Sequence, residues 1–152
     1  MFNDDRAVSV AVGYVLNFAV AALLISGLLI AGGSLIESQT KQVTADELSV
    51  VGHQLADDLS SADRLVRAGE TSAVSIRSDL PRRTAAGGYT IEIEVEENSD
   101  KGTIELRTTD PEVTVRVLFR SATELEDGSV TGGPVSIEYD VDEGGVLEVT
   151  ST

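Results

Sequence analysis

Residues 8–36 read VSVAVGYVLNFAVAALLISGLLIAGGSLI and contain no charged side chain. As a helix, this stretch measures about 43 Å, which exceeds the roughly 30 Å hydrocarbon core of a bilayer. It is also too long for the apolar part of a cleaved secretory signal, which has about 7 to 15 residues. We therefore predict a single transmembrane helix over residues 8–36.

Small residues recur within the uncharged stretch. Gly13 lies near its start, and Ala19, Ala22, Ser26 and Gly33 follow at three- and four-residue steps with one step skipped. Those last four residues share one helical face, and small side chains allow helix backbones to approach closely in lipid. We expect this helix to pack against other helices, although a plain membrane anchor also contains Gly and Ala.

Residues 37–69 continue with an amphipathic helical pattern. Polar side chains lie elsewhere around this helix, at Asp57, Asp58, Asp63 and Arg64. Apolar side chains recur at three- and four-residue spacing, which is typical of a helix with one buried face: Leu48, Val51, Leu55, Leu59, Ala62 and Leu65. Gly69 is placed as a helix cap. The pattern predicts one helix from near Val8 to Ala68, about 90 Å long if unbroken, with Gly32-Gly33 as the place for a bend.

From Val74 onward the apolar period changes from 3.6 to 2, which indicates strands. The clearest are Tyr89–Glu96 and Val113–Phe119, each with one apolar face; weaker ones are Thr103–Arg107, Val135–Val141 and Val146–Thr150. Turns are expected at Asn98–Gly102, Asp110-Pro111, Gly132-Gly133-Pro134 and Asp142–Gly145. Residues 70–152 are thus predicted to form five or six antiparallel strands in a sheet or sandwich. The apolar face of the amphipathic helix, Leu48 to Leu65, either covers part of these strands or faces a neighbouring molecule. The fold class is α+β.

The composition limits the kinds of partner. Acidic residues number 26 against 11 basic ones, and the formal net charge is −15, which disfavours nucleic acid and other polyanions. The acidic residues alternate with Val and Ile, as on a solvated strand face, and such a surface resembles that of proteins from salt-loving archaea. Without cysteine, the chain forms neither disulfides nor thiolate metal sites.

A short motif stands at the entrance to the uncharged stretch. Asp4 and Asp5 precede a segment from Arg6 to Gly13 that reads RAVSVAVG. This segment resembles the entrance of archaeal type IV pilin and archaellin-like precursors, in which a leader ends in a basic residue and Ala or Gly. The pattern of that family is Arg-Ala-Val-Ser-Pro-Val-Ile-Gly, so Val10 stands in place of Pro. The resemblance covers the leader and the apolar helix, and it does not extend to the strand domain.

The resemblance implies how the chain is processed. Residues 1–7 would be a leader, and a membrane prepilin peptidase would recognise Arg6 and Ala7 and cut between Ala7 and Val8 on the cytoplasmic side. The charges on the two flanks of the helix do not decide its orientation in the membrane. By the resemblance, the strand domain would lie outside the cell. Val12 occupies the place of a Glu in bacterial pilins, which leaves the new amine of Val8 without an evident partner. The ordinary alternative is an uncleaved signal anchor that starts after a charged residue.

No pattern of catalytic residues stands out. His53 is the only histidine and lies in the amphipathic helix without a second metal-binding partner, so it is read as an ordinary helix residue. The acid groups Glu96-Glu97, Glu124-Glu126-Asp127 and Asp142-Glu143 offer ligands for Ca²⁺, but they lack the spacing of a known calcium loop. A solvated surface explains them better. We expect neither an enzyme nor a cofactor.

Two functions fit these observations. The first is a minor pilin-like structural subunit of an archaeal type IV pilus-like filament or of its assembly machinery, with the membrane, the peptidase and other pilin-like subunits as partners. The second is a single-pass membrane anchor that displays an external binding module without entering a filament.

Overall fold

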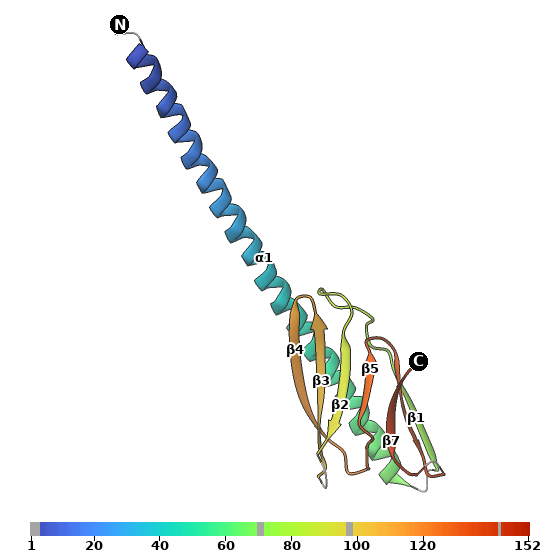
Figure 1. Cartoon of the computed structure of the whole chain (residues 1–152). Helices are drawn as coiled ribbons and strands as arrows, with labels where there is room; N and C mark the ends of the chain where they lie inside the picture. Colours follow the sequence, from blue (N-terminus) through green and yellow to red (C-terminus); the bar gives the residue numbers. More distant parts are fainter. Residues whose placement is uncertain (1–3, 70–71, 97–98, 143) are drawn as a thin grey trace. The chain divides into compact units, whose positions relative to one another are not determined.

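The computed structural model describes residues 4–69, 72–96, 99–142 and 144–152, with side chains from residue 9 onward (Figure 1). This part of the chain contains one helix and seven strands: α1 (Asp4–Ala68), β1 (Ala73–Ser78), β2 (Thr90–Val95), β3 (Lys101–Thr109), β4 (Glu112–Arg120), β5 (Gly128–Thr131), β6 (Val135–Asp140) and β7 (Leu147–Ser151). A long helix followed by antiparallel strands confirms the α+β class. The chain divides into two compact units, Met1–Gln39 and Thr40–Thr152.

Helix α1 starts at Asp4, ahead of the predicted start near Val8. It continues without interruption through Gly32 and Gly33, the position at which the sequence favours a bend. It ends at Ala68, directly before Gly69, at the predicted position, although Gly69 does not adopt the positive φ of a glycine cap. The described helix contains no proline, so no backbone donor is missing along it.

All five predicted strands are present, and their single buried faces are confirmed. In β2, Ile91 and Ile93 are buried between exposed glutamates, and in β4 the alternate residues Val117 and Phe119 are buried. The expected total of five or six strands is wrong, because β1 and β5 add two. β3 also starts at Lys101, inside the predicted turn Asn98–Gly102. β5 has only four residues, so its period is too short to recognise in the sequence.

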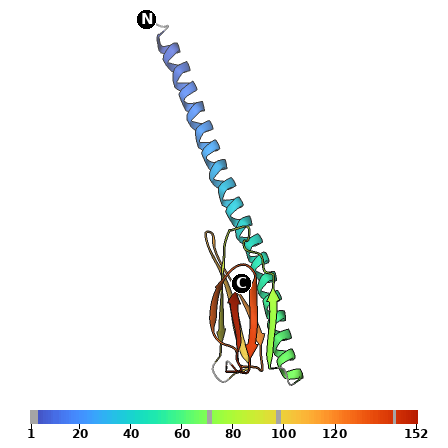
Figure 2. The same ribbon diagram turned by 90° about the vertical axis from the view of Figure 1, so that its right-hand side faces the viewer.

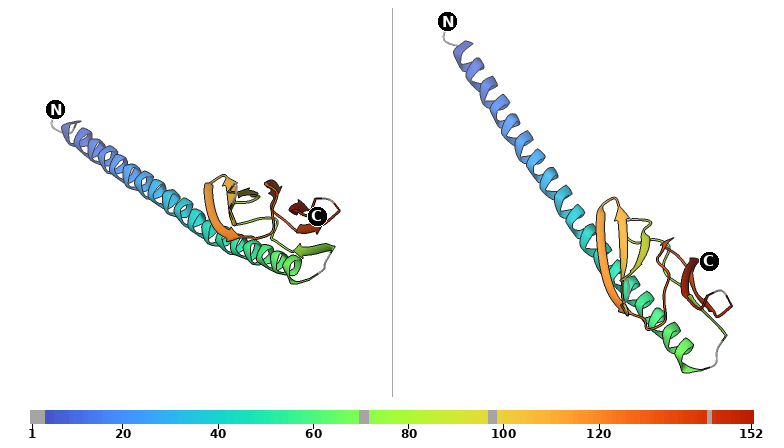
Figure 3. Two further views of the ribbon diagram at one scale, coloured as in Figure 1. Left: turned by 90° about the horizontal axis from the view of Figure 1, so that it is seen from below. Right: turned by 60° about the horizontal axis from the view of Figure 1, so that its bottom comes forward.

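The strands form two antiparallel sheets, with orders β1-β6-β7 and β4-β3-β2-β5. The sheets meet at β5 and β7, where the chain between β4 and β5 bonds to β7: Leu147 donates to the carbonyl of Glu124 (2.8 Å) and Glu126 donates to the carbonyl of Leu147 (2.9 Å). Within the unit Thr40–Thr152, both sheets lie on one side of the helix, as the views in Figures 1 and 2 agree. Figure 3, seen from below, shows the strands as a curved layer over the green end of α1.

The predicted apolar face of α1 builds the core of this unit. Its members Leu48, Leu55 and Leu59 are fully buried together with Ile91 and Ile104 from the four-stranded sheet. The helix therefore covers the sheets and does not leave this face for a neighbour, which decides between the two options that the sequence left open. Leu65 is the exception to the predicted face, because half of its surface is exposed.

Asp63 departs from the prediction in the opposite direction. Its side chain is buried, although the helical pattern places it away from the apolar face. One carboxylate oxygen accepts hydrogen bonds from the backbone of Ala122 (3.1 Å), the backbone of Thr123 (2.8 Å) and the Thr123 hydroxyl (2.8 Å). Arg67, one turn further along α1, places its Nε 3.2 Å from the other oxygen. Asp63 thus ties the end of the helix to the segment that follows β4.

Thr44 is a buried side chain whose hydroxyl has no hydrogen-bond partner among the described residues. A buried, unpaired hydroxyl costs about 1 to 3 kcal/mol of stability. Replacing Thr44 by valine keeps the branched shape and removes the unpaired oxygen, so the free energy of unfolding should rise by about 1 kcal/mol. Chemical unfolding of the full chain in detergent measures this difference. The matched variant Thr44→Ser, which keeps the hydroxyl, should be less stable than the wild type.

Candidate functional site: the uncharged part of helix α1

The described side chains of the uncharged stretch, Ser9 to Ile36, are all exposed within the unit Met1–Gln39. Large apolar groups stand open, with Tyr14 exposed to 75% and Phe18 to 77%. By length and composition α1 is able to cross a membrane. Removing apolar surface from water gains about 25 cal/mol per Å², so lipid or other apolar helices are favourable surroundings for this helix.

The predicted packing residues are present on this helix and are open to a partner. A methyl group added at Gly13 or Gly33 would meet no atom within 4 Å. Ser26 donates its hydroxyl to the carbonyl of Ala22 (2.8 Å), so this hydroxyl is satisfied without water. At about 100° per residue, Ala19, Ala22, Ser26 and Gly33 fall within roughly 60° of one another. We call these four residues the small-residue face.

Asn17 is a packing candidate that the sequence analysis missed. It is the only carboxamide in residues 8–36, and it makes no hydrogen bond to any residue that the structure describes. It lies about 140 to 200° around the helix from the small-residue face, on the side of Gly13. An amide in lipid finds its donors and acceptors on neighbouring helices. The helix therefore carries packing features on two opposite sides, and the lone amide was the sequence signal for the second one.

The predicted cleavage residues Arg6, Ala7 and Val8 fall at the start of α1, and their side chains lie outside the described residues. In the chain they directly precede the exposed apolar side chains of this helix.

His53 is exposed on α1, with its Nδ1 2.7 Å from the carbonyl oxygen of Ser49. This contact occupies one ring nitrogen within the helix itself. His53 is therefore an ordinary surface residue of the helix.

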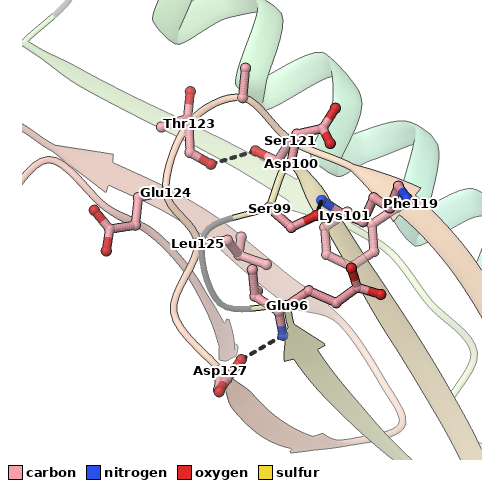
Figure 4. A pocket seen from close by; sticks show the side chains of 12 residues that line it. Glu96, Ser99, Asp100, Lys101, Phe119, Ser121, Thr123, Glu124, Leu125 and Asp127 are labelled. Atoms are coloured by element: carbon pink, nitrogen blue, oxygen red, sulfur yellow. Dashed lines mark hydrogen bonds between the residues drawn. The ribbon is translucent and has the colours of Figure 1, made fainter.

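A hollow of about 560 Å³ lies where β2, β3 and β4 meet the segment before β5. Figure 4 shows its carboxylates Glu96, Asp100, Glu124 and Asp127 around the hollow, without convergence on one point. Asp127 accepts a hydrogen bond from the backbone of Val95 (2.7 Å), so its carboxylate is engaged in the fold. Among the described residues no three acidic or histidine side chains are grouped to hold a metal ion. Glu97 and Glu143 of the predicted acid pairs lie outside the described residues.

Comparison with known proteins places the chain in a family. Residues 3–150 match the family described as "Family of unknown function (DUF7266)". No curated protein matches the chain. No solved structure matches it either. Since the family match covers nearly the whole sequence, the chain belongs to the DUF7266 family of unknown function.

Proposed function

We propose that this protein is a minor pilin-like structural subunit of an archaeal type IV pilus-like filament or of the machinery that assembles it. A prepilin peptidase removes residues 1–7, and the uncharged helix then moves from the membrane into a bundle of equivalent helices. The strand domain stays on the outside of the cell, where its carboxylates keep the surface hydrated. The observation that carries the proposal is that the uncharged part of α1, with all its described side chains exposed, follows directly after Arg6-Ala7 in the chain.

The exposure of the helix supports assembly. The apolar side chains of Ser9 to Ile36 are not covered by other parts of their own unit, so their stable surrounding comes from other molecules. The small-residue face allows a second helix to approach closely, and Asn17 offers hydrogen bonds on the opposite side. A helix that binds neighbours on two opposite sides adds subunits on both, whereas a single contact face would stop at a pair.

Removal of the leader supports the same proposal on electrostatic grounds. Asp4, Asp5 and Arg6 are charged, and charges buried in an apolar helix bundle are strongly unfavourable. A chain that starts at Val8 brings into the bundle an uncharged helix and one terminal amine. Cleavage thus converts a membrane-anchored precursor into a helix that packs inside an assembly.

Mass spectrometry of the N-terminus of the protein isolated from its own cells tests the proposal. We expect the mature chain to start at Val8 and to be present in filaments sheared from the cell surface. Replacing Arg6 by Gln or Ala7 by Leu should leave at least about ten times more of the chain with its leader, because the peptidase loses its basic contact or its small residue at the cut. The matched control Asp4→Asn, also in the leader, should be processed normally.

A chain that retains residues 1–7 in every fraction is not a substrate of the peptidase and contradicts the proposal. A chain that starts at Val8 but remains wholly in the membrane fraction contradicts a place in the filament and leaves a place in the assembly machinery. The first result favours the membrane-anchored binding module, in which the strand domain acts alone on an external ligand.

A further inference from the structure

A second hollow, of about 300 Å³, lies at the start of β2 and the end of β3. Arg82, Arg107 and the threonines 90, 109 and 131 are among its lining residues, and no carboxylate lines it. We call it the arginine hollow. In a chain with a net charge of −15, a concave site with two guanidinium groups and no acidic lining residue has a distinct ligand preference. Guanidinium groups bind carboxylates through paired, charge-assisted hydrogen bonds.

Arg82 is the group in this hollow that is available to a ligand. Arg107 already pairs with Glu105, whereas Arg82 makes no ion pair with any described residue. The backbone at Arg82 is held in place, because Tyr89 donates its hydroxyl to the carbonyl of Pro81 (2.6 Å). Burial raises the pKa of Tyr89 to about 12, so the phenol stays protonated and keeps donating. The position of Arg82 is therefore built into the loop, and its charge is left unpaired.

The hollow with the four carboxylates lies at the other end of the same sheet. The strand register places Thr90 beside Arg107 and Thr131 at one end, and Val95 beside Gly102 at the other. The five-residue step from Thr90 to Val95 separates these ends by about 17 Å. We call the hollow of Glu96, Asp100, Glu124 and Asp127 the carboxylate hollow. Its only basic lining residue is Lys101, so the side chains that line the two hollows carry opposite charge.

We propose that the arginine hollow of one subunit binds the carboxylate hollow of a second copy of this chain, in a head-to-tail contact between strand domains. Arg82 is the donor, and the side chains of Glu96 and Glu124 are the acceptors, since neither makes a hydrogen bond to another described residue. A contact between two different surfaces leaves one of each free on the pair, so it adds further copies and does not close at a dimer. The inference rests on the proposed assembly function and deepens it by naming a partner surface outside the helix.

The contact is expected to form at high salt concentration, because it depends on short hydrogen bonds between charged groups. Screening weakens charge attraction beyond about 3 Å at 1 M salt. Hydrogen bonds from a guanidinium to a carboxylate act within that range, so they persist where longer-range attraction is screened.

Cysteine cross-linking in the full chain tests the contact, because the sequence has no cysteine of its own. Gly88→Cys places a thiol in the arginine hollow, where an added side chain meets no atom within 4 Å. Ala122→Cys places one at the exposed edge of the carboxylate hollow and keeps the charge unchanged. Membranes and sheared filaments are treated with a flexible bis-maleimide and analysed on denaturing gels. Four strains are compared: one carries both cysteines in one chain, two carry one single variant each, and the fourth expresses the two single variants together.

We expect a ladder of dimers, trimers and longer products from the double variant, dimers alone from the two co-expressed single variants, and monomers from each single variant. Arg82→Glu in the double variant should reduce the products at least about tenfold, whereas Arg83→Glu, which lines a different hollow, should leave them unchanged. Dimers from either single variant alone would overturn the inference in favour of a contact between like ends. Monomers from the double variant would also overturn it.

The ladder and the filament answer separate questions. A ladder from chains that retain their leader supports the contact and contradicts the filament proposal. Wild-type chains that start at Val8 and lie in filaments, combined with no ladder from the double variant, contradict the contact alone.

Discussion

Replacing Asp63 by alanine is expected to lower the free energy of unfolding by about 3 kcal/mol, because the change leaves three partly buried donors without their acceptor. The backbone amides of Ala122 and Thr123 and the Thr123 hydroxyl all point at one carboxylate oxygen of Asp63, which is itself buried in the fold. Each of these donors loses its partner at once. Chemical unfolding of the full chain in detergent, followed by circular dichroism, measures the loss.

The matched control is Asp57→Ala, on the same helix. Asp57 has an exposed side chain, so its removal should change stability by no more than about 0.5 kcal/mol. Equal losses for the two variants would contradict the role assigned to Asp63.

The contribution of Asp63 should depend on pH in a defined direction. Burial alone raises the pKa of the Asp63 carboxyl, but the hydrogen bonds from Thr123, the charge of Arg67 and the hydrogen bond from Ala122 outweigh it and bring the pKa below 3.8. Because the pKa in the folded state is the lower one, the stabilisation is complete above the pKa of the unfolded chain and is lost as pH falls through the folded value. The stability gap between wild type and Asp63→Asn should therefore be constant above about pH 5 and narrow below about pH 4.

Replacing Gly52 by valine should destabilise the strand domain by about 2 to 3 kcal/mol. Gly52 is a point where α1 lies close against β3 and β4. A Cβ there would stand 2.7 Å from Val117 Cγ2 and 2.8 Å from Leu106 Cδ1, both on buried side chains. Losing a glycine from the helix interior returns less than about 1 kcal/mol, so the clash decides the sign. The melting temperature of the full chain, followed by circular dichroism, measures the effect.

Gly69 provides the control for this prediction. An added Cβ at Gly69 meets no atom within 4 Å, so Gly69→Val should leave the melting temperature nearly unchanged. A Gly52→Val variant as stable as the wild type would mean that the helix does not lie on β3 and β4 as described.

The candidate site was readable from the sequence to a large extent, because it depends on local composition. A charge-free run predicts a helix suited to lipid wherever it occurs, and small residues on one face are identified by counting. Asn17 was equally visible as the only amide in the run. The arginine hollow could not be predicted from the sequence. Arg82 and Arg107 lie far apart in the chain, and they line one hollow because β2 pairs with β3, which places Thr90 beside Arg107.

The uncharged helix, its amphipathic continuation, the helix end at Gly69 and the strands with regular alternation could all be predicted from the sequence. These features follow from periods of 3.6 and 2 in residues close along the chain. The burial of Asp63, the exposure of Leu65, the pairing of β5 with β2 and the opposite charge of the residues lining the two hollows emerge only in the folded domain. Burial, strand order and electrostatic environment depend on contacts between residues distant in sequence, which no local period encodes.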